Sequence, residues 1–425
     1  MKRSFLWKSA KATAVAAAMA GVLGAAALSS AAQADGDVKV GYLIPLSGTA
    51  AASIGQEMSR ATHLAVKHIN ESGGIEALGG AKLELVEVDT RGDAQVAITE
   101  AERLINVEKV STLIGAFQSS VTFPASAVAE KYQVPWIVDL SAKAEITERG
   151  FKYVFRPTQI PSSGNAASAA DFIEWVGGAT GTAPKTAAIV YENTDWGQDL
   201  ANTMRDRLNK AGIEIVFDES YPPNSPNLRP LVVKLKGAKP DVISMTSYTG
   251  DAIQLQKLVA QLRVDTMGII GSAAGHVDRT FIPTVGEKET NYVLSTNGWA
   301  GYDSAITTPF AHRFWDDYVA THNADPTEFG VSAYADVWIL KDALERAGSA
   351  DPKAIRDALA ETKMMDNDVA KLVGYDIAFD ETNQNTLKRF VVQQIQDGKY
   401  YTVWPEKLKP EGYEMVWPAP KWSDR

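Results

Sequence analysis

Short apolar runs and longer amphipathic stretches alternate along most of this chain. Runs rich in Val, Ile and Leu are typical of buried strands, whereas apolar residues spaced three and four apart are typical of helices. The predicted strands cover residues 38–43, 83–88, 110–117, 134–140, 186–191, 213–217, 242–248 and 267–270. The predicted helices cover residues 56–71, 93–107, 121–132, 197–211 and 251–263. This alternation indicates an α/β fold in which helices cover both faces of parallel-rich sheets.

The chain contains a faint internal repeat. The strand, loop and helix of residues 39–75 resemble those of residues 186–213, with Gly55 and Gly197 at equivalent places. Two copies of one βα unit indicate two lobes of similar design. We place the first passage between the lobes near residues 153–163, where a strand pattern runs into a turn that contains Pro and Gly.

Residues 1–34 have the pattern of an export signal. Basic residues open the chain, an uncharged apolar run follows at 12–28, and Ala32-Gln33-Ala34 is a small-x-small cleavage site. A membrane-spanning helix is the weaker alternative for so short a run. We expect cleavage near Ala34 and a mature protein in the periplasm. The sequence has no cysteine, which argues against a lipid-anchored cysteine and against a disulfide framework.

The mature chain is acidic. The sequence has 42 Lys and Arg against 52 Asp and Glu, and loss of the four basic residues of the signal brings the formal charge to −14. A surface of this sign disfavours nucleic acid and anionic membranes as partners. The sequence contains no nucleophile elbow, P-loop, dinucleotide fingerprint or HExxH motif. His63 and His68 stand five apart on one predicted helix, and we expect both at the surface. No catalytic residue, cofactor or metal site is predicted.

Candidate binding residues lie in the loops that follow predicted strands. In open α/β sheets, ligands bind beyond the carboxyl ends of the strands. One cleft between two lobes is the simplest account of several such loops. The candidates are Ile54, Ser119, Ser120, Ser141, Ala142, Trp196, Tyr248, Ala273 and Trp299.

Two of these loops carry specific chemistry. Ser119 or Ser120 at the start of a helix offers a hydroxyl and free backbone N–H groups, which suit a carboxylate. Either serine is equally well explained as an ordinary N-cap. Trp196 stands in a polar loop, where it either caps its lobe or covers a ligand.

The order of motifs along the chain resembles the Leu/Ile/Val-binding family of periplasmic solute-binding proteins. The matches include Val40-Gly41 with 45–48, Asn70 with 73–75, Ile114-Gly115 with Ser119, Arg156-Pro157, Tyr334 and 343–348. The resemblance spans nearly all of the mature chain. It implies a type I periplasmic-binding fold, in which two Rossmann-like lobes are joined by three crossovers. The implied boundaries are 35–157 and 299–372 for the first lobe, and 158–298 and 373–425 for the second.

The resemblance also assigns roles to several candidates. The family's carboxylate-binding serine matches Ser119, and its second polar loop matches Ser141 and Ala142. Its two cleft tyrosines match Trp196 and Tyr248.

One departure from the family concerns the ligand's amine. The acidic residue that holds an α-ammonium in the family falls at 271–275, where this chain has no carboxylate. Either the anchor has moved, with Asp195, Asp251 or a backbone carbonyl as substitutes, or the ligand has no α-amine.

These features together predict the substrate-binding component of an ABC importer. We expect a monomer that captures a small carboxylate by hinge closure and delivers it to permease subunits in the inner membrane. An amino acid, branched-chain or aromatic, is the first choice of ligand. The alternatives are an aromatic or aliphatic carboxylate or short amide as ligand, a sensor for a membrane signalling partner, and an exported hydrolase. The hydrolase is disfavoured because no nucleophile–base pair is visible.

Overall fold

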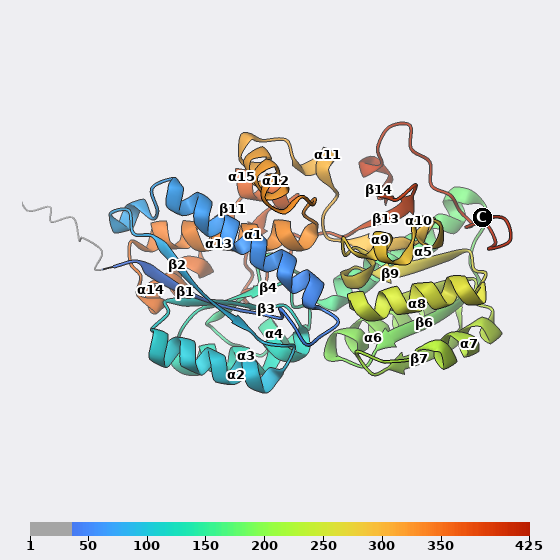
Figure 1. Cartoon of the computed structure of the whole chain (residues 1–425), viewed down its shortest axis with the longest axis horizontal. Coiled ribbons are helices and arrows are strands. Elements are labelled where there is room, and N and C mark those ends of the chain that lie inside the picture. The colour runs from blue at the N-terminus through green and yellow to red at the C-terminus, as the bar shows by residue number, and fades with distance from the viewer. Residues whose placement is uncertain (1–35) are drawn as a thin grey trace, which may run out of the picture.

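The computed structural model describes residues 36–425, and the predicted signal peptide lies outside the described residues. Two β-sheets with their covering helices lie side by side, and the chain passes between them near the middle of the molecule (Figure 1). We call the part around the first sheet the first lobe and the part around the second sheet the second lobe. None of the helices within 36–425 has the length and apolar character needed to cross a membrane.

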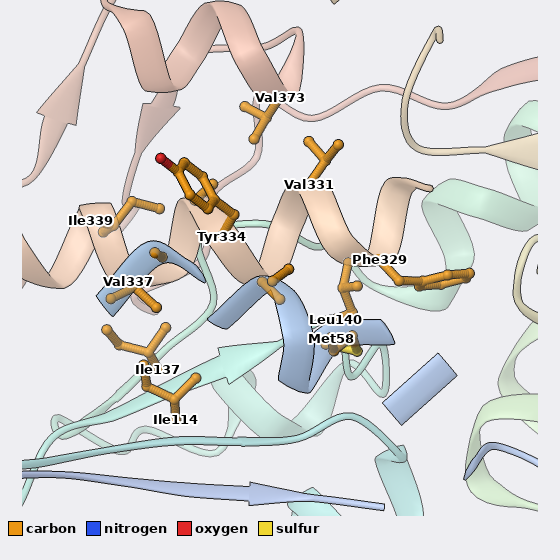
Figure 2. Close-up of a cluster of buried hydrophobic side chains, with 14 of the residues drawn as sticks. Met58, Ile114, Ile137, Leu140, Phe329, Val331, Tyr334, Val337, Ile339 and Val373 are labelled. Carbon is orange, nitrogen blue, oxygen red and sulfur yellow. The ribbon is translucent and has the colours of Figure 1, made fainter. Parts of the chain in front are cut away.

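The first sheet has five strands in the order β2-β1-β3-β4-β5, and every neighbouring pair is parallel. Its strands are β1 (Val38–Ile44), β2 (Leu83–Asp89), β3 (Thr112–Ala116), β4 (Trp136–Asp139) and β5 (Val154–Phe155). Helices α1 (Ala52–Glu71) and α13 (Glu328–Ala347) cover one face, and α2 (Ala94–Arg103) and α3 (Ser119–Tyr132) cover the other. Figure 2 shows side chains of α13, among them Tyr334 and Val337, above Ile114 of β3 and Ile137 of β4.

The second sheet has seven strands in the order β14-β13-β10-β9-β8-β6-β7. The five strands from β10 to β7 in this order pair in parallel. Strands β13 and β14 extend the sheet beyond β10 in antiparallel pairing. The strands are β6 (Thr186–Glu192), β7 (Glu214–Tyr221), β8 (Val242–Thr246), β9 (Gly268–Ser272), β10 (Leu294–Asn297), β13 (Val391–Gln396) and β14 (Lys399–Trp404). One face packs on α5 (Ser162–Thr180) and α6 (Asp195–Lys210), and the other on α7 (Arg229–Ala238) and α8 (Thr249–Leu262).

Three crossovers join the lobes. The first runs from β5 to α5, the second from β10 to the first-lobe helix α12 (Pro309–His322), and the third leads into β13. The prediction placed this last passage after residue 372. However, β12 (Ile377–Ala378) pairs with β11 (Lys363–Met364), and the ring of Phe379 lies 5.4 Å from that of Phe155 in the first lobe. We therefore move the third crossover to residues 380–390, because the chain before it still packs on the first lobe.

Side-chain hydrogen bonds explain two local features of the first lobe. The side chain of Asp93 accepts a hydrogen bond from the Val96 backbone N–H at 2.9 Å, so Asp93 caps the start of α2. The surface prediction for His68 is wrong: its imidazole is fully buried and lies between the Tyr334 hydroxyl and the Asp317 carboxylate, at 2.8 and 2.9 Å. The helix pattern of α1 missed this because helices far away in sequence, α12 and α13, supply the polar partners.

The two glycines of the internal repeat share one structural role. Gly55 lies in the first turn of α1 and Gly197 in the first turn of α6, each facing the end of the preceding strand. A Cβ atom on Gly55 would collide with the carbonyl oxygen of Pro45, and one on Gly197 with that of Glu192. The backbone of each helix therefore approaches the strand end too closely for any side chain.

Alanine substitution at these glycines should destabilise the protein. We expect Gly55→Ala and Gly197→Ala each to lower the free energy of unfolding by about 1–3 kcal/mol, because the added methyl forces the helix away from the strand. Urea denaturation of the two variants measures this. Gly237→Ala in α7 is the matched control, since open space surrounds that position, and should be neutral or stabilising by about 1 kcal/mol. Equal behaviour of all three variants would contradict the assigned role.

Candidate functional site

A cavity lies between the two lobes. It measures about 30 Å³ and is formed by loops that leave the carboxyl ends of β3, β4, β6, β8 and β9, together with residues of the crossovers, α5 and α13. Its lining residues are Phe117, Ser119, Leu140, Ala142, Gln159, Asn165, Trp196, Tyr248, Ala273, Ala274, Glu328, Phe329 and Phe390. The carboxyl ends of parallel strands from both sheets therefore meet at one site, as expected for this sheet topology.

Aromatic rings from both lobes form one wall of this cavity. Trp196 stacks on Tyr248 in the second lobe, with ring centroids 4.9 Å apart. The ring of Phe117, from the first lobe, lies 5.7 Å from Tyr248 and 5.9 Å from Phe329. Contacts of this kind stabilise the closed arrangement and present flat apolar surfaces to a ligand.

Ser119 supplies the polar end of the cavity. It is the first residue of α3, and its Oγ accepts hydrogen bonds from the backbone N–H groups of Ala142 and Lys143, at 3.0 and 3.1 Å. Because these two bonds occupy the oxygen's lone pairs, the hydroxyl proton is available for donation. Within residues 36–425 the backbone N–H groups of Ser119 and Ser120 have no hydrogen-bond acceptor. The N-cap of α3 is Gln118, so Ser119 is not serving as the cap.

The structure brings five of the nine predicted site residues to the cavity. These are Ser119, Ala142, Trp196, Tyr248 and Ala273. Ser120 follows Ser119 on α3 but does not line the cavity.

Ser141, Ile54 and Trp299 lie elsewhere. The Ser141 hydroxyl is used internally, at 2.5 Å from Thr122 Oγ1 and 2.8 Å from the Phe117 carbonyl oxygen, so it braces the loop behind Ser119. Ile54 is fully buried in the first-lobe core. Trp299 donates its indole N–H to the Leu372 carbonyl at 3.0 Å and stacks on a helix of the first lobe. Strand-end position alone did not show which way these side chains point.

Several lining residues carried no sequence signal. Gln159 and Phe390 belong to crossovers, Asn165 lies in the first turn of α5, and Glu328 and Phe329 begin α13. They do not follow strands, so the strand-end rule could not find them. Only Gln159 could have been anticipated, because it lies in the predicted first passage between the lobes.

The acidic residues proposed as substitute amine anchors do not reach the cavity. Asp195 lies 3.7 Å from Lys143 across the lobe boundary, and Asp251 accepts a hydrogen bond from the Asn224 backbone N–H at 2.9 Å. Among the described lining residues only Glu328 carries a carboxylate, and Lys388 already pairs with it at 3.1 Å. No cluster of three or more potential metal ligands occurs in the part of the chain that the structure describes.

Contacts across the cleft show that the lobes are closed. The Ala50 backbone N–H donates to Asn224 Oδ1 at 2.6 Å, and Ser53 Oγ lies 3.3 Å from Asp278 Oδ1. These contacts join the loop before α1 and the first turn of α1 to two loops of the second lobe. A ligand larger than one or two waters therefore enters only when the lobes separate or the aromatic wall moves.

A buried carboxyl group holds the second-lobe side of the site in place. Glu192, at the end of β6, accepts hydrogen bonds from Thr194 Oγ1 at 2.8 Å and from the Tyr248 backbone N–H at 3.3 Å. It thus ties the start of α6, which carries Trp196, to Tyr248 at the start of α8. Burial raises the pKa of Glu192 to about 8.

Two α/β lobes that close over an interlobe cavity define a solute-binding protein of the periplasmic type. The sequence model of the family described as periplasmic binding protein matches residues 37–399. The chain belongs to this family, and within it to the Leu/Ile/Val-binding proteins, as the order of its motifs predicted. It is a periplasmic binding protein of the Leu/Ile/Val-binding type, from a family of binding proteins and not of enzymes.

Relatives and solved structures cover nearly the whole chain. Leu/Ile/Val-binding protein homolog 7 of Brucella suis is 32% identical over 396 residues, which cover 90% of this chain and 95% of the relative. The LivJ substrate-binding protein of Streptococcus pneumoniae, solved with isoleucine, has a TM-score of 0.76 at 24% identity and covers 86% of this chain and 97% of its own. A solute-binding protein of R. palustris in complex with benzoate has a TM-score of 0.73 at 20% identity, with coverage of 87% and 96%. These likenesses confirm the two-lobe α/β fold.

The raised pKa of Glu192 leads to a pH-dependent stability. Between the ordinary value of 4.5 and about 8, the folded protein keeps a proton that the unfolded chain has lost. Stability therefore falls as pH rises through this window, by at most about 1.4 kcal/mol per pH unit for this group. We expect Glu192→Gln to weaken the decline in unfolding free energy between pH 5 and pH 8, measured by urea denaturation. Glu84→Gln, at an exposed strand position, is the control. Equal slopes in Glu192→Gln and the unsubstituted protein would contradict the assignment.

Proposed function

We propose that this substrate-binding protein captures a small carboxylate whose body is aromatic or branched and apolar. The observation that carries the proposal is the hydroxyl of Ser119. Its oxygen is saturated by two backbone N–H donors, so its proton points toward a ligand anion, beside unpaired N–H groups at the start of α3. A hydroxyl donor and a helix start together favour a negatively charged group.

The rest of the cavity suits an apolar body. Five of its lining residues are aromatic, namely Phe117, Trp196, Tyr248, Phe329 and Phe390. Leu140, Ala142, Ala273 and Ala274 add aliphatic surface. Burying a ring or a branched chain between these groups contributes about 25 cal/mol per Å² of apolar surface removed from water.

An α-ammonium group is not required by this site. The positions expected to carry an acidic anchor are Ala273 and Ala274, and the Glu328 carboxylate is already compensated by Lys388. A desolvated ammonium without its own partner costs several kcal/mol. We therefore rank carboxylates without an amine first. The benzoate found in the R. palustris relative supports this order.

An amino acid is the second candidate. The names of the Brucella relatives and the isoleucine bound to the S. pneumoniae protein support it. The observation in this structure that favours it is the position of Glu328, the one carboxylate among the described lining residues.

We propose hinge closure as the mechanism. A ligand first binds the first lobe through Ser119, and the second lobe then closes with Trp196 and Tyr248. Only the closed form contains both halves of the site, so ligand shifts the balance between open and closed forms. We further propose that the mature protein is a periplasmic monomer, released by cleavage near Ala34, and that the permease in the inner membrane recognises its closed form.

A thermal-shift screen with matched ligands tests the ligand class. The panel pairs benzoate and phenylacetate with phenylalanine, and 4-methylpentanoate and 4-methyl-2-oxopentanoate with leucine. A ligand at about one hundred times its Kd adds about 2.7 kcal/mol of stability. We expect shifts with the carboxylates that lack an amine. Shifts with leucine or phenylalanine alone would favour the second candidate, and shifts with neutral amides alone would contradict the carboxylate site.

Substitution of Ser119 should weaken binding of any carboxylate that the screen identifies. Loss of a hydrogen bond to a charged group costs about 1.5–3 kcal/mol, so we expect Ser119→Ala to raise the Kd about 10- to 100-fold in titration calorimetry. Ser126→Ala is the matched control, because Ser126 is a buried serine on the same helix whose hydroxyl bonds to the Thr122 carbonyl, away from the cavity. An unchanged Kd in Ser119→Ala would remove this serine from the site.

A further inference from the structure

A fully buried ion pair lies where the lobes join. Lys388 Nζ is 3.1 Å from Glu328 Oε1, and the side chains of the two residues are 0% and 1% exposed. Lys388 lies on the third crossover, and Glu328 is the first residue of α13 in the first lobe. A buried charge pair of this kind is costly to build, so its position calls for an explanation in terms of function.

The pair is bonded to all three crossovers. Lys388, itself on the third, donates to the Thr158 carbonyl oxygen of the first crossover at 2.8 Å. The second oxygen of Glu328 accepts a hydrogen bond from the Gly298 backbone N–H, at the start of the second crossover, at 2.5 Å. The three chain segments that connect the lobes are thus joined through two side chains.

Backbone and aromatic rings pack directly against the pair. A Cβ atom on Gly298 would collide with the side chains of both Glu328 and Lys388, so the backbone of the second crossover lies directly against the pair. The rings of Phe390 and Tyr375 flank the ammonium group, with centroids 5.1 and 5.7 Å from Nζ.

The same pair reaches the ligand cavity. Glu328 is a lining residue, and so are Gln159 of the first crossover and Phe390 of the third. A ligand in the cavity is therefore in contact with the ion pair and with two of the segments that the pair connects.

We propose that the Glu328–Lys388 pair couples the ligand cavity to the hinge by holding the three crossovers in the orientation of the closed lobes. Hinge opening changes the orientation of the crossovers relative to one another. The pair opposes this change because neither charge can replace a lost partner with water while it stays buried. The inference rests on the hinge closure proposed above, and it assigns the two residues a positioning role.

Lobe distance in the absence of ligand tests the coupling. The chain has no cysteine, so cysteines at Val107 in the first lobe and Val233 in the second, which are 70% and 53% exposed, accept a donor and an acceptor dye specifically. Single-molecule energy transfer then gives the ratio of closed to open molecules. The variant Glu328→Gln/Lys388→Met removes both charges together, so that neither is left buried alone. We expect the closed-to-open ratio to fall about five- to tenfold or more.

A general loss of stability must be separated from this effect. Ile355→Ala, at a fully buried position of the first-lobe core away from the crossovers, is the control. It should lower the melting temperature and leave the lobe distribution unchanged. A cooperatively melting double variant with the unsubstituted distribution would overturn the inference. So would an unsubstituted protein that has no closed molecules without ligand.

A milder variant keeps the test decisive if the double variant does not fold. Glu328→Gln preserves the shape and an acceptor for Gly298 and removes the charge attraction alone, and we expect an intermediate fall in the closed fraction. No fall in Glu328→Gln would then overturn the inference. Because these distributions are recorded without ligand, they are independent of the ligand screen. A screen with no carboxylate response contradicts the proposed ligand and leaves the lobe measurement intact.

Discussion

The direction in which the parallel strands end is the constraint on which the site depends. In both sheets the carboxyl ends of the strands face the space between the lobes, so the loops after β3, β4, β6, β8 and β9 converge there. The tight contacts at Gly55 and Gly197 belong to the same arrangement, because they allow a helix to start immediately beyond a strand end. Segments that are distant in sequence therefore bring polar groups, helix starts and aromatic rings together around the interlobe cavity.

The periodicity of the sequence predicted most of this architecture. Strands with continuous apolar runs and helices with one apolar face were visible because each pattern is local. The third crossover was misplaced because the short pair of β11 and β12 depends on contacts with the first lobe that no local pattern encodes. His68 was assigned to the surface for the same reason, since its partners on α13 and α12 are more than 240 residues away.

The site was predictable to the extent that it follows strands. Ser119, Trp196 and Tyr248 were found by position, whereas Ser141 follows a strand yet turns inward to bond with Thr122. Glu328 and Lys388 could not be recognised, because a carboxylate at a helix start and a lysine in a loop are ordinary surface features in a sequence. Their burial arises only when three distant segments come together.

The side chains of the cavity come from strand-end loops, crossovers and helix starts, and none of them lies on a strand of either sheet. A substitution at a strand end therefore changes the surface that meets the ligand and leaves the pairing of the strands unaltered. New ligand preferences can thus arise by substitutions at the strand ends while the two sheets keep their order and register. The alanines at 273 and 274 are consistent with such a step away from an acidic anchor.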